Sequence, residues 1–232
     1  MKLYDDCITR LKAFLGEFAP LSPDMPEAPW PAGGRNQLIF QSDTACELGG
    51  GGKPGLSGTL LTQSGDVRDQ VLLLGADLPQ LRGNAPYARV SIVRVNPQSL
   101  GQGEALYKAV RRLEYTRYHV SPEGYMPRIS VRNHRENVRV SKNALSRGLT
   151  FGNVGKCYCD AYHAHPEVQA VTTVFITHPD FPYRELERLL DHAEDITKAL
   201  DHLVKDMKMD CHVCSLRTVC EEVEAKLQSD FQ

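Results

Sequence analysis

The segment VQAVTTVFIT, Val168 to Thr177, is the stretch from which the fold can be worked out. It carries no charge and is rich in β-branched residues, which is typical of a strand buried inside a sheet. The residues before it favour a helix that begins after Gly152. After it, apolar side chains recur at helical spacing, so we expect a long helix that is capped by Asp180, runs to about Met209 and delivers Cys211 at its end.

The remaining segments alternate between strand-like and helix-like patterns. Residues 1–18 predict an amphipathic helix, and the five prolines of residues 20–34 predict an extended arm that includes Trp30. Strands are expected at 35–41, 56–63, 69–77 and 88–95, a helix at 103–120 and a hairpin at 127–142. Because strands and helices do not alternate strictly, we predict an α+β fold with a mixed sheet and packed helices.

Three regions follow from these patterns. We expect an N-terminal helix with a proline-rich arm (1–34), an α+β domain (35–178), and a long helix with a cysteine-rich tail (179–232). No apolar run reaches the roughly 18 residues of a membrane span, and the N-terminus lacks the features of a signal peptide. We therefore expect a cytoplasmic protein without a membrane partner.

Charge is unevenly distributed, although the formal net charge is only −2. Residues 108–147 contain ten Lys or Arg and only three Glu. Residues 180–230 contain thirteen acidic and seven basic residues. Two solvated faces would explain this, and so would a basic surface for an anionic ligand with an acidic surface for a docking partner. Few aromatic residues interleave the basic segment, so nucleic-acid binding is not expected.

Three cysteines near the C-terminus, Cys211, Cys214 and Cys220, have the spacing C-x2-C-x5-C and are called the cysteine motif below. In a reducing compartment, clustered thiols indicate metal binding or redox chemistry, and thiolates suit iron–sulfur clusters, zinc and copper. The chain has no second C-x2-C pair of the zinc-finger kind. The fourth ligand is open between another cysteine (Cys7, Cys46, Cys157 or Cys159), His212, water, substrate and another subunit.

A second group of metal-type donors lies in CYCDAYHAH, Cys157 to His165. On a helix, Cys159 and His163 fall on one face four residues apart, with Asp160 nearby, and zinc accepts such a set. The alternative is that the cysteines are small buried residues and the histidines simply end a helix. Cys157 and Cys159 are therefore kept as further metal-ligand candidates.

Several segments, taken in order, resemble the β subunit (acetyl-CoA synthase) of the CO dehydrogenase/acetyl-CoA synthase complex. They are CELGGGGKPG, RRLEYTRYHV, NVRVSKNALSRGLTFGNVG, VTTVFIT and DCHVC, and they span about residues 44 to 220. The resemblance implies the middle domain of that subunit and the start of its cluster-binding domain. It implies that Cys211 and Cys214, with Cys220 at a shorter spacing, ligate an iron–sulfur cluster of the 4Fe–4S kind.

The resemblance also implies ligands and partners. Arg139 and Lys142 match the family's basic strand, and Arg111, Arg112 and Arg117 are the best further candidates for holding an anion such as the phosphates of coenzyme A. A CO dehydrogenase, a corrinoid protein or a ferredoxin would be partners, and self-association is a further option. The family's C-G-C-F-E-C segment, which holds nickel, is missing, so neither nickel nor complete acetyl-CoA synthase activity is expected.

These observations lead to competing hypotheses of function. The first is an iron–sulfur protein that acts in electron transfer, docking or assembly in anaerobic one-carbon or corrinoid metabolism. The second is an enzyme that binds coenzyme A or a thioester and uses an incompletely ligated cluster. The third is an interaction module stabilised by zinc, and the fourth is an α+β domain with unliganded thiols.

Overall fold

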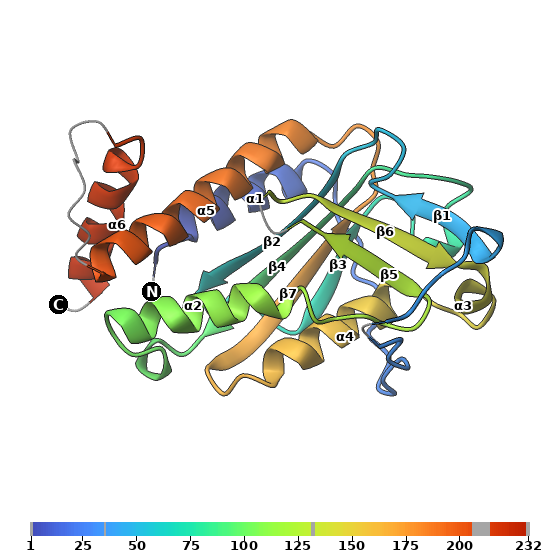
Figure 1. Ribbon diagram of the computed structural model, residues 1–232, viewed down its shortest axis with the longest axis horizontal. Helices are drawn as coiled ribbons and strands as arrows, with labels where there is room; N and C mark the ends of the chain where they lie inside the picture. The colour runs from blue at the N-terminus through green and yellow to red at the C-terminus, as the bar shows by residue number, and fades with distance from the viewer. Residues whose placement is uncertain (1, 35, 131–132, 206–213, 231–232) are drawn as a thin grey trace.

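The computed structural model describes residues 2–34, 36–130, 133–205 and 214–230 (Figure 1). The chain forms the expected α+β fold around two sheets. The larger sheet is mixed and has the strand order β2-β4-β7-β3, and the smaller sheet is antiparallel with the order β1-β6-β5. The strands are β1 Thr44–Leu48, β2 Gly55–Thr62, β3 Gln70–Leu74, β4 Tyr87–Val95, β5 Tyr125–Ile129, β6 Glu136–Ser141 and β7 Val168–Ile176.

The strand predicted from Val168 to Thr177 is β7, and it lies inside the larger sheet. It pairs antiparallel with β4 on one side and parallel with β3 on the other. Its residues from Ala170 to Ile176 are all buried, as the uncharged, β-branched sequence predicts. The strand therefore has apolar or hydrogen-bonded neighbours on both faces.

Helices cover both faces of the larger sheet. They are α1 Asp5–Gly16, α2 Glu104–Thr116, α3 Lys142–Ser146, α4 Phe151–His163, α5 Tyr183–Val204 and α6 Arg217–Asp230. Short 3-10 helices span Gln41–Asp43, Leu78–Gln80 and Pro97–Ser99. In Figure 1, α1 lies beside α5, α6 packs at the far end of α5, and α2 runs along the β2 side of the sheet.

Two glycines allow the helices of opposite faces to approach the sheet. A Cβ atom on Gly58 of β2 would lie 2.3 Å from a methyl carbon of Leu190 on α5. A Cβ atom on Gly155 of α4 would lie 2.2 Å from a methyl carbon of Val71 on β3. Because neighbouring residues of a strand alternate between faces, the registers place Gly58 and Val71 on opposite faces. The layer order is therefore α5, sheet, α4.

Some of the expected boundaries are wrong. Residues 36–40 form no strand, and β1 follows at Thr44–Leu48 instead. Asp180 does not cap α5, which begins at Tyr183 without a side-chain cap because Pro182 occupies the capping position. The described part of this helix ends at Val204, and its expected continuation to Met209 lies outside the described residues. The helix α6 was not expected.

The N-terminal arm is extended and follows the body of the protein. Leu21 forms an isolated bridge with Leu73 of β3, and Ala32 forms one with Pro122. Trp30 donates its indole N–H to the Glu123 carbonyl at 2.9 Å, which attaches the arm to the body. Residues from all three expected regions contribute to one hydrophobic core. Within the described residues, no helix has the length and apolar character that crossing a membrane requires.

A buried ion pair joins the two sheets. Arg89 of β4 and Glu136 of β6 are completely buried, and the guanidinium donates to both carboxylate oxygens, at 2.6 and 3.2 Å. The Tyr87 hydroxyl lies 3.2 Å from the same carboxylate and 2.5 Å from the hydroxyl of Tyr125. The ring of Tyr158 on α4 lies 4.0 Å from the guanidinium carbon. These contacts connect both sheets and α4 at one point.

Breaking this pair is expected to destabilise the fold strongly. In Glu136→Gln the buried guanidinium loses its counter-charge, and such a loss reduces the free energy of unfolding by about 3–5 kcal/mol. The double variant Arg89→Met with Glu136→Gln should lose less, because no unpaired charge remains buried. Urea unfolding followed by circular dichroism measures both values. A loss below about 1 kcal/mol in Glu136→Gln would contradict the role given to the pair.

Candidate functional site

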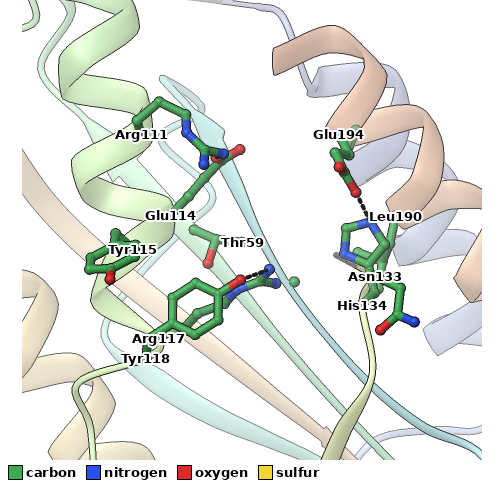
Figure 2. A pocket seen from close by; sticks show the side chains of 12 residues that line it. Thr59, Arg111, Glu114, Tyr115, Arg117, Tyr118, Asn133, His134, Leu190 and Glu194 are labelled. Atoms are coloured by element: carbon green, nitrogen blue, oxygen red, sulfur yellow. Dashed lines mark hydrogen bonds and ion pairs between the residues drawn. The ribbon is translucent and has the colours of Figure 1, made fainter. Parts of the chain in front are cut away.

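A polar pocket lies between α2 and α5, above the edge strand β2 (Figure 2). Its floor is Gly58 and Thr59, and its volume is about 90 Å³. Drug-sized ligands occupy roughly 300–1,000 Å³, so this pocket suits a small molecule or one end of a larger one. Its polar lining includes Arg111, Glu114, Arg117, Tyr118, His134 and Glu194.

Backbone pairing with β2 fixes the position of His134. The Ser57 N–H donates to the His134 carbonyl at 2.7 Å, and Leu56 forms an isolated antiparallel bridge with Arg135. The segment that enters β6 is therefore attached to the larger sheet at its β2 edge. This attachment holds the His134 side chain over the pocket, with only 8% of the residue exposed.

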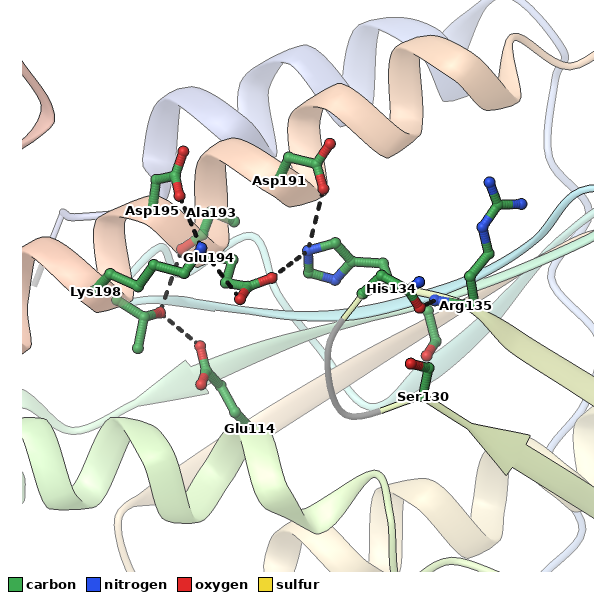
Figure 3. A network of polar contacts seen from close by, with 12 residues as sticks. Glu114, Ser130, His134, Arg135, Asp191, Ala193, Glu194, Asp195 and Lys198 are labelled. Carbon is green, nitrogen blue, oxygen red and sulfur yellow. Dashed lines mark hydrogen bonds and ion pairs between the residues drawn. The ribbon is translucent and has the colours of Figure 1, made fainter. Parts of the chain in front are cut away.

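Two carboxylates and one guanidinium surround the His134 ring. Its Nε2 lies 3.3 Å from Glu194 and 3.8 Å from Asp191, and Figure 3 shows both contacts. Both ring nitrogens are buried, and Nε2 forms an ion pair with Glu194 when the ring is protonated. Burial and the positive charge of Arg117 lower the pKa of His134, although both carboxylates act in the opposite direction. The imidazole is thus neutral, and basic, at neutral pH.

Arg117, just after α2, brings positive charge to the pocket. Its Nη1 donates to the Ser57 carbonyl at 2.8 Å, and its Nη2 donates to the Tyr118 hydroxyl at 2.9 Å. Its Nε is buried without a hydrogen-bond partner among the described residues. In the described part of the chain, no carboxylate lies within ion-pair distance of this guanidinium. Arg117 is therefore positioned to bind an anion.

Glu114 provides a mostly buried carboxyl group on the α2 wall, across the pocket from His134. It accepts a hydrogen bond from the Thr197 hydroxyl at 2.7 Å and pairs with Arg111 at 2.8 Å. Burial raises the pKa of Glu114, while these two contacts lower it in part. Figure 3 shows Glu114 and Glu194 facing the same space from α2 and α5. The pocket combines two guanidinium groups, an imidazole and two carboxyl groups, which are the groups used in ligand binding and acid–base chemistry.

A second cavity of about 250 Å³ lies further along α2 and α5. It shares Arg111 and Glu194 with the pocket and adds Tyr107, Lys198 and His202. The two cavities therefore lie on either side of the same charged side chains. A molecule whose one end fills the pocket has room to extend along this direction.

The structure divides the five basic residues proposed from the sequence among separate places. Arg111 and Arg117 both line the pocket. Arg112 pairs instead with the buried Glu167. Arg139 pairs with Glu47 at 2.8 Å on the smaller sheet, and the Lys142 ammonium donates to the Ser42 carbonyl at 2.9 Å. Residues that are clustered in the sequence are therefore dispersed in space.

The cysteine motif is only partly described. Cys211 and His212 both lie outside the described residues. Cys214 precedes α6 and its carbonyl accepts the Arg217 N–H at 3.3 Å, while Cys220 lies within α6 and packs against the core. Cys7 on α1 lies near α6, because its neighbour Asp6 pairs with Lys226 of α6 at 2.7 Å.

The other two metal-ligand candidates are on α4, the helix that covers the face of the sheet opposite α5. The thiol of Cys157 faces the Trp30 carbonyl at 4.0 Å, and burial raises the pKa of Cys157. Cys159 is buried and lies next to Asp69 and His163. Figure 1 shows α6 at one end of the molecule and α4 below the middle of the sheet, so Cys157 and Cys159 lie apart from Cys214 and Cys220.

Sequence reasoning missed the acid–base residues of the pocket. His134 lies in the polar run that precedes β6, where a histidine is ordinarily exposed. Glu114 and Glu194 belong to helices whose charges look like those of any solvated face. The one usable signal was the apolar stripe of α5, which indicates that Leu190 and Ala193 face inward next to Glu194.

The chain matches no protein-family model, and no curated protein matches it significantly. The site must therefore be interpreted from its own geometry.

The lowered pKa of His134 makes a prediction about stability and pH. Below its ordinary pKa of about 6.5, an unfolded chain takes up a proton that the folded His134 resists. Wild type should therefore lose stability relative to His134→Gln as the pH falls from 7.5 to 5.5. Urea unfolding of both proteins at the two pH values measures the difference in their free energies of unfolding. The other histidines are the same in both proteins, so their contributions cancel. If wild type instead gains stability relative to His134→Gln as the pH falls, the pKa of the folded His134 is raised and the prediction is wrong.

Proposed function

We propose that the protein binds a small molecule with an anionic group in the pocket between α2 and α5, and that His134 exchanges a proton with it. The observation that carries the proposal is the half-buried Arg117, which lines the pocket without a carboxylate at ion-pair distance among the described residues. A carboxylate or phosphate group would supply the missing negative charge beside this guanidinium.

The proton-transfer role follows from the surroundings of His134. A neutral imidazole is a base at neutral pH, and His134 lines the pocket, so a bound molecule that reaches the ring would exchange a proton with it. Glu194, 3.3 Å away, stabilises the imidazolium once it forms. The ligand class includes coenzyme A, of which one phosphate would fit the pocket while the rest extends toward the second cavity.

Binding of anions tests the proposal directly. We expect glycolate, inorganic phosphate or coenzyme A to raise the melting temperature of the protein. At about ten times the dissociation constant the stabilisation is about 1.4 kcal/mol, or roughly 3–6 °C for a chain of this size. Differential scanning fluorimetry measures the shift, and isothermal titration calorimetry gives the affinity.

The variants make this test specific. Arg117→Met should abolish the shift, and His134→Gln should weaken it. Lys108→Met is the matched control, because Lys108 is an exposed base on the same helix and pairs with Glu104. Circular dichroism checks that each variant is folded. Absence of a shift with all three anions, or an equal shift in Arg117→Met, would overturn the proposal.

A second candidate function is favoured by the cysteine motif. We propose that Cys211, Cys214 and Cys220 hold an iron–sulfur cluster, and that the protein acts in electron transfer, docking or assembly in a reducing, cytoplasmic setting. The spacing C-x2-C-x5-C and the resemblance to the acetyl-CoA synthase subunit support it. Cys7 is a candidate fourth ligand, because α1 brings it near α6.

Metal analysis of anaerobically purified protein tests this second function. We expect about four irons per chain and a broad absorption band near roughly 400 nm, both lost in Cys211→Ala. Cys46→Ala is the control, because this buried cysteine belongs to β1 in the smaller sheet. One zinc without a visible band would identify a structural zinc site instead, and would exclude the cluster.

A further inference from the structure

Three metal-type donors meet where α4 ends beside the start of β3. They are the Asp69 carboxylate, the Cys159 thiol and the His163 imidazole, whose ligand atoms all lie within 4.8 Å of one another. Asp69 directly precedes β3, and Cys159 and His163 are one turn apart on α4. Among the described residues, this is the only group of three or more His, Cys, Asp or Glu side chains close enough to share a metal ion.

The fold explains why these residues meet. Residues four apart on a helix share one face, which aligns Cys159 with His163. The chain passes from α4 directly into β7, and β3 pairs parallel with β7, so the start of β3 lies beside the end of α4. The Val171 N–H of β7 donates to Asp69 Oδ1 at 2.8 Å and orients the carboxylate toward the helix.

The sequence analysis paired Cys159 and His163 with a different carboxylate. Asp160 belongs to the same helix but forms an ion pair with Lys156, whose ammonium lies 2.6 Å from Asp160 Oδ2. Asp69 takes its place, because His163 Nε2 lies 2.9 Å from Asp69 Oδ1. The third donor, Asp69, therefore lies ninety residues before Cys159 in the sequence.

The spacing of the donors is close to that of a tetrahedral metal site. With zinc–sulfur bonds of about 2.3 Å and zinc–nitrogen or zinc–oxygen bonds of about 2.1 Å, tetrahedral ligands are roughly 3.4–3.6 Å apart. The separations found here, from 2.9 to within 4.8 Å, bracket that range.

Burial and charge also suit a metal ion. Cys159 is 5% exposed, while the Asp69 and His163 side chains are 45% and 34% exposed, so an ion can enter from solvent and meet the thiol on its inner side. Burial and the neighbouring Asp69 raise the pKa of Cys159 to about 12. Without a metal ion the thiol is protonated, and metal binding releases that proton to solvent.

We propose that Asp69, Cys159 and His163 bind one zinc ion, with a fourth coordination position open to water or to another ligand. One sulfur, one nitrogen and one oxygen donor form a set that zinc accepts readily. The Val171 N–H that holds Asp69 is an outer contact of the kind that orients metal ligands. The site is independent of the cysteine motif and of the pocket.

The test separates this site from the cysteine motif. In full-length protein carrying Cys211→Ser, Cys214→Ser and Cys220→Ser, titration with Co²⁺ should give one equivalent bound, with the visible bands of tetrahedral cobalt and a thiolate charge-transfer band. Zn²⁺ should displace the cobalt. Adding Cys159→Ser should remove the charge-transfer band. Asp69→Asn, which keeps an acceptor for Val171, should weaken zinc binding by about 10–100-fold or more, since even outer-shell changes have effects of that size.

Two matched controls come from the same helix. Cys157→Ser and Asp160→Asn each remove a metal-type donor that points elsewhere, so both should bind zinc like their parent. If the triple serine variant does not fold, zinc content can be compared in otherwise wild-type protein, where His163→Gln should lower it by one equivalent. Absence of zinc binding in the folded triple variant, or unchanged affinity in both Cys159→Ser and His163→Gln, would overturn the proposal.

Discussion

The contact on which the rest of the structure depends is the buried ion pair between Arg89 and Glu136. Both side chains are completely buried. The two charges pair with each other, and tyrosine side chains surround them. Since an unpaired charge in this position is strongly unfavourable, the register of β6 against the larger sheet is strictly determined. Glu136 must face Arg89, and the residues before it must follow the β2 edge.

That constraint produces the pocket. His134 is two residues before Glu136, and its backbone pairs with Ser57. The same Ser57 accepts a hydrogen bond from Arg117 through its carbonyl oxygen. A single residue of β2 therefore sets the positions of both the imidazole and the guanidinium. Both side chains line the same pocket as a result.

The sequence predicts the elements that depend on local pattern. The strand β7, the long helix α5 and the hairpin of β5 and β6 follow from apolar periodicity and β-branched content. The strand β1 was missed because its residues Thr44 to Leu48 are only partly buried, and a short apolar run just before it gave the stronger signal. A helix of mostly exposed residues, such as α6, has little periodicity to detect.

Both sites combine what the sequence can and cannot show. The pair of Cys159 and His163 follows from helical spacing alone, whereas Asp69 joins it only through the parallel pairing of β3 with β7. Arg111 and Arg117 belong to a basic segment that the sequence singles out, but their separation from Arg139 depends on the smaller sheet. Contacts between distant elements decide each site, and one sequence contains no direct record of them.

The length of helix α5 connects two distant parts of the molecule. Its 22 residues form one continuous rod of roughly 33 Å, since each residue adds about 1.5 Å. One part of it is a wall of the pocket, and another part carries α6, in which Cys220 lies. The same helix therefore anchors both the pocket wall and the packing of Cys220, although these lie at different points along its length.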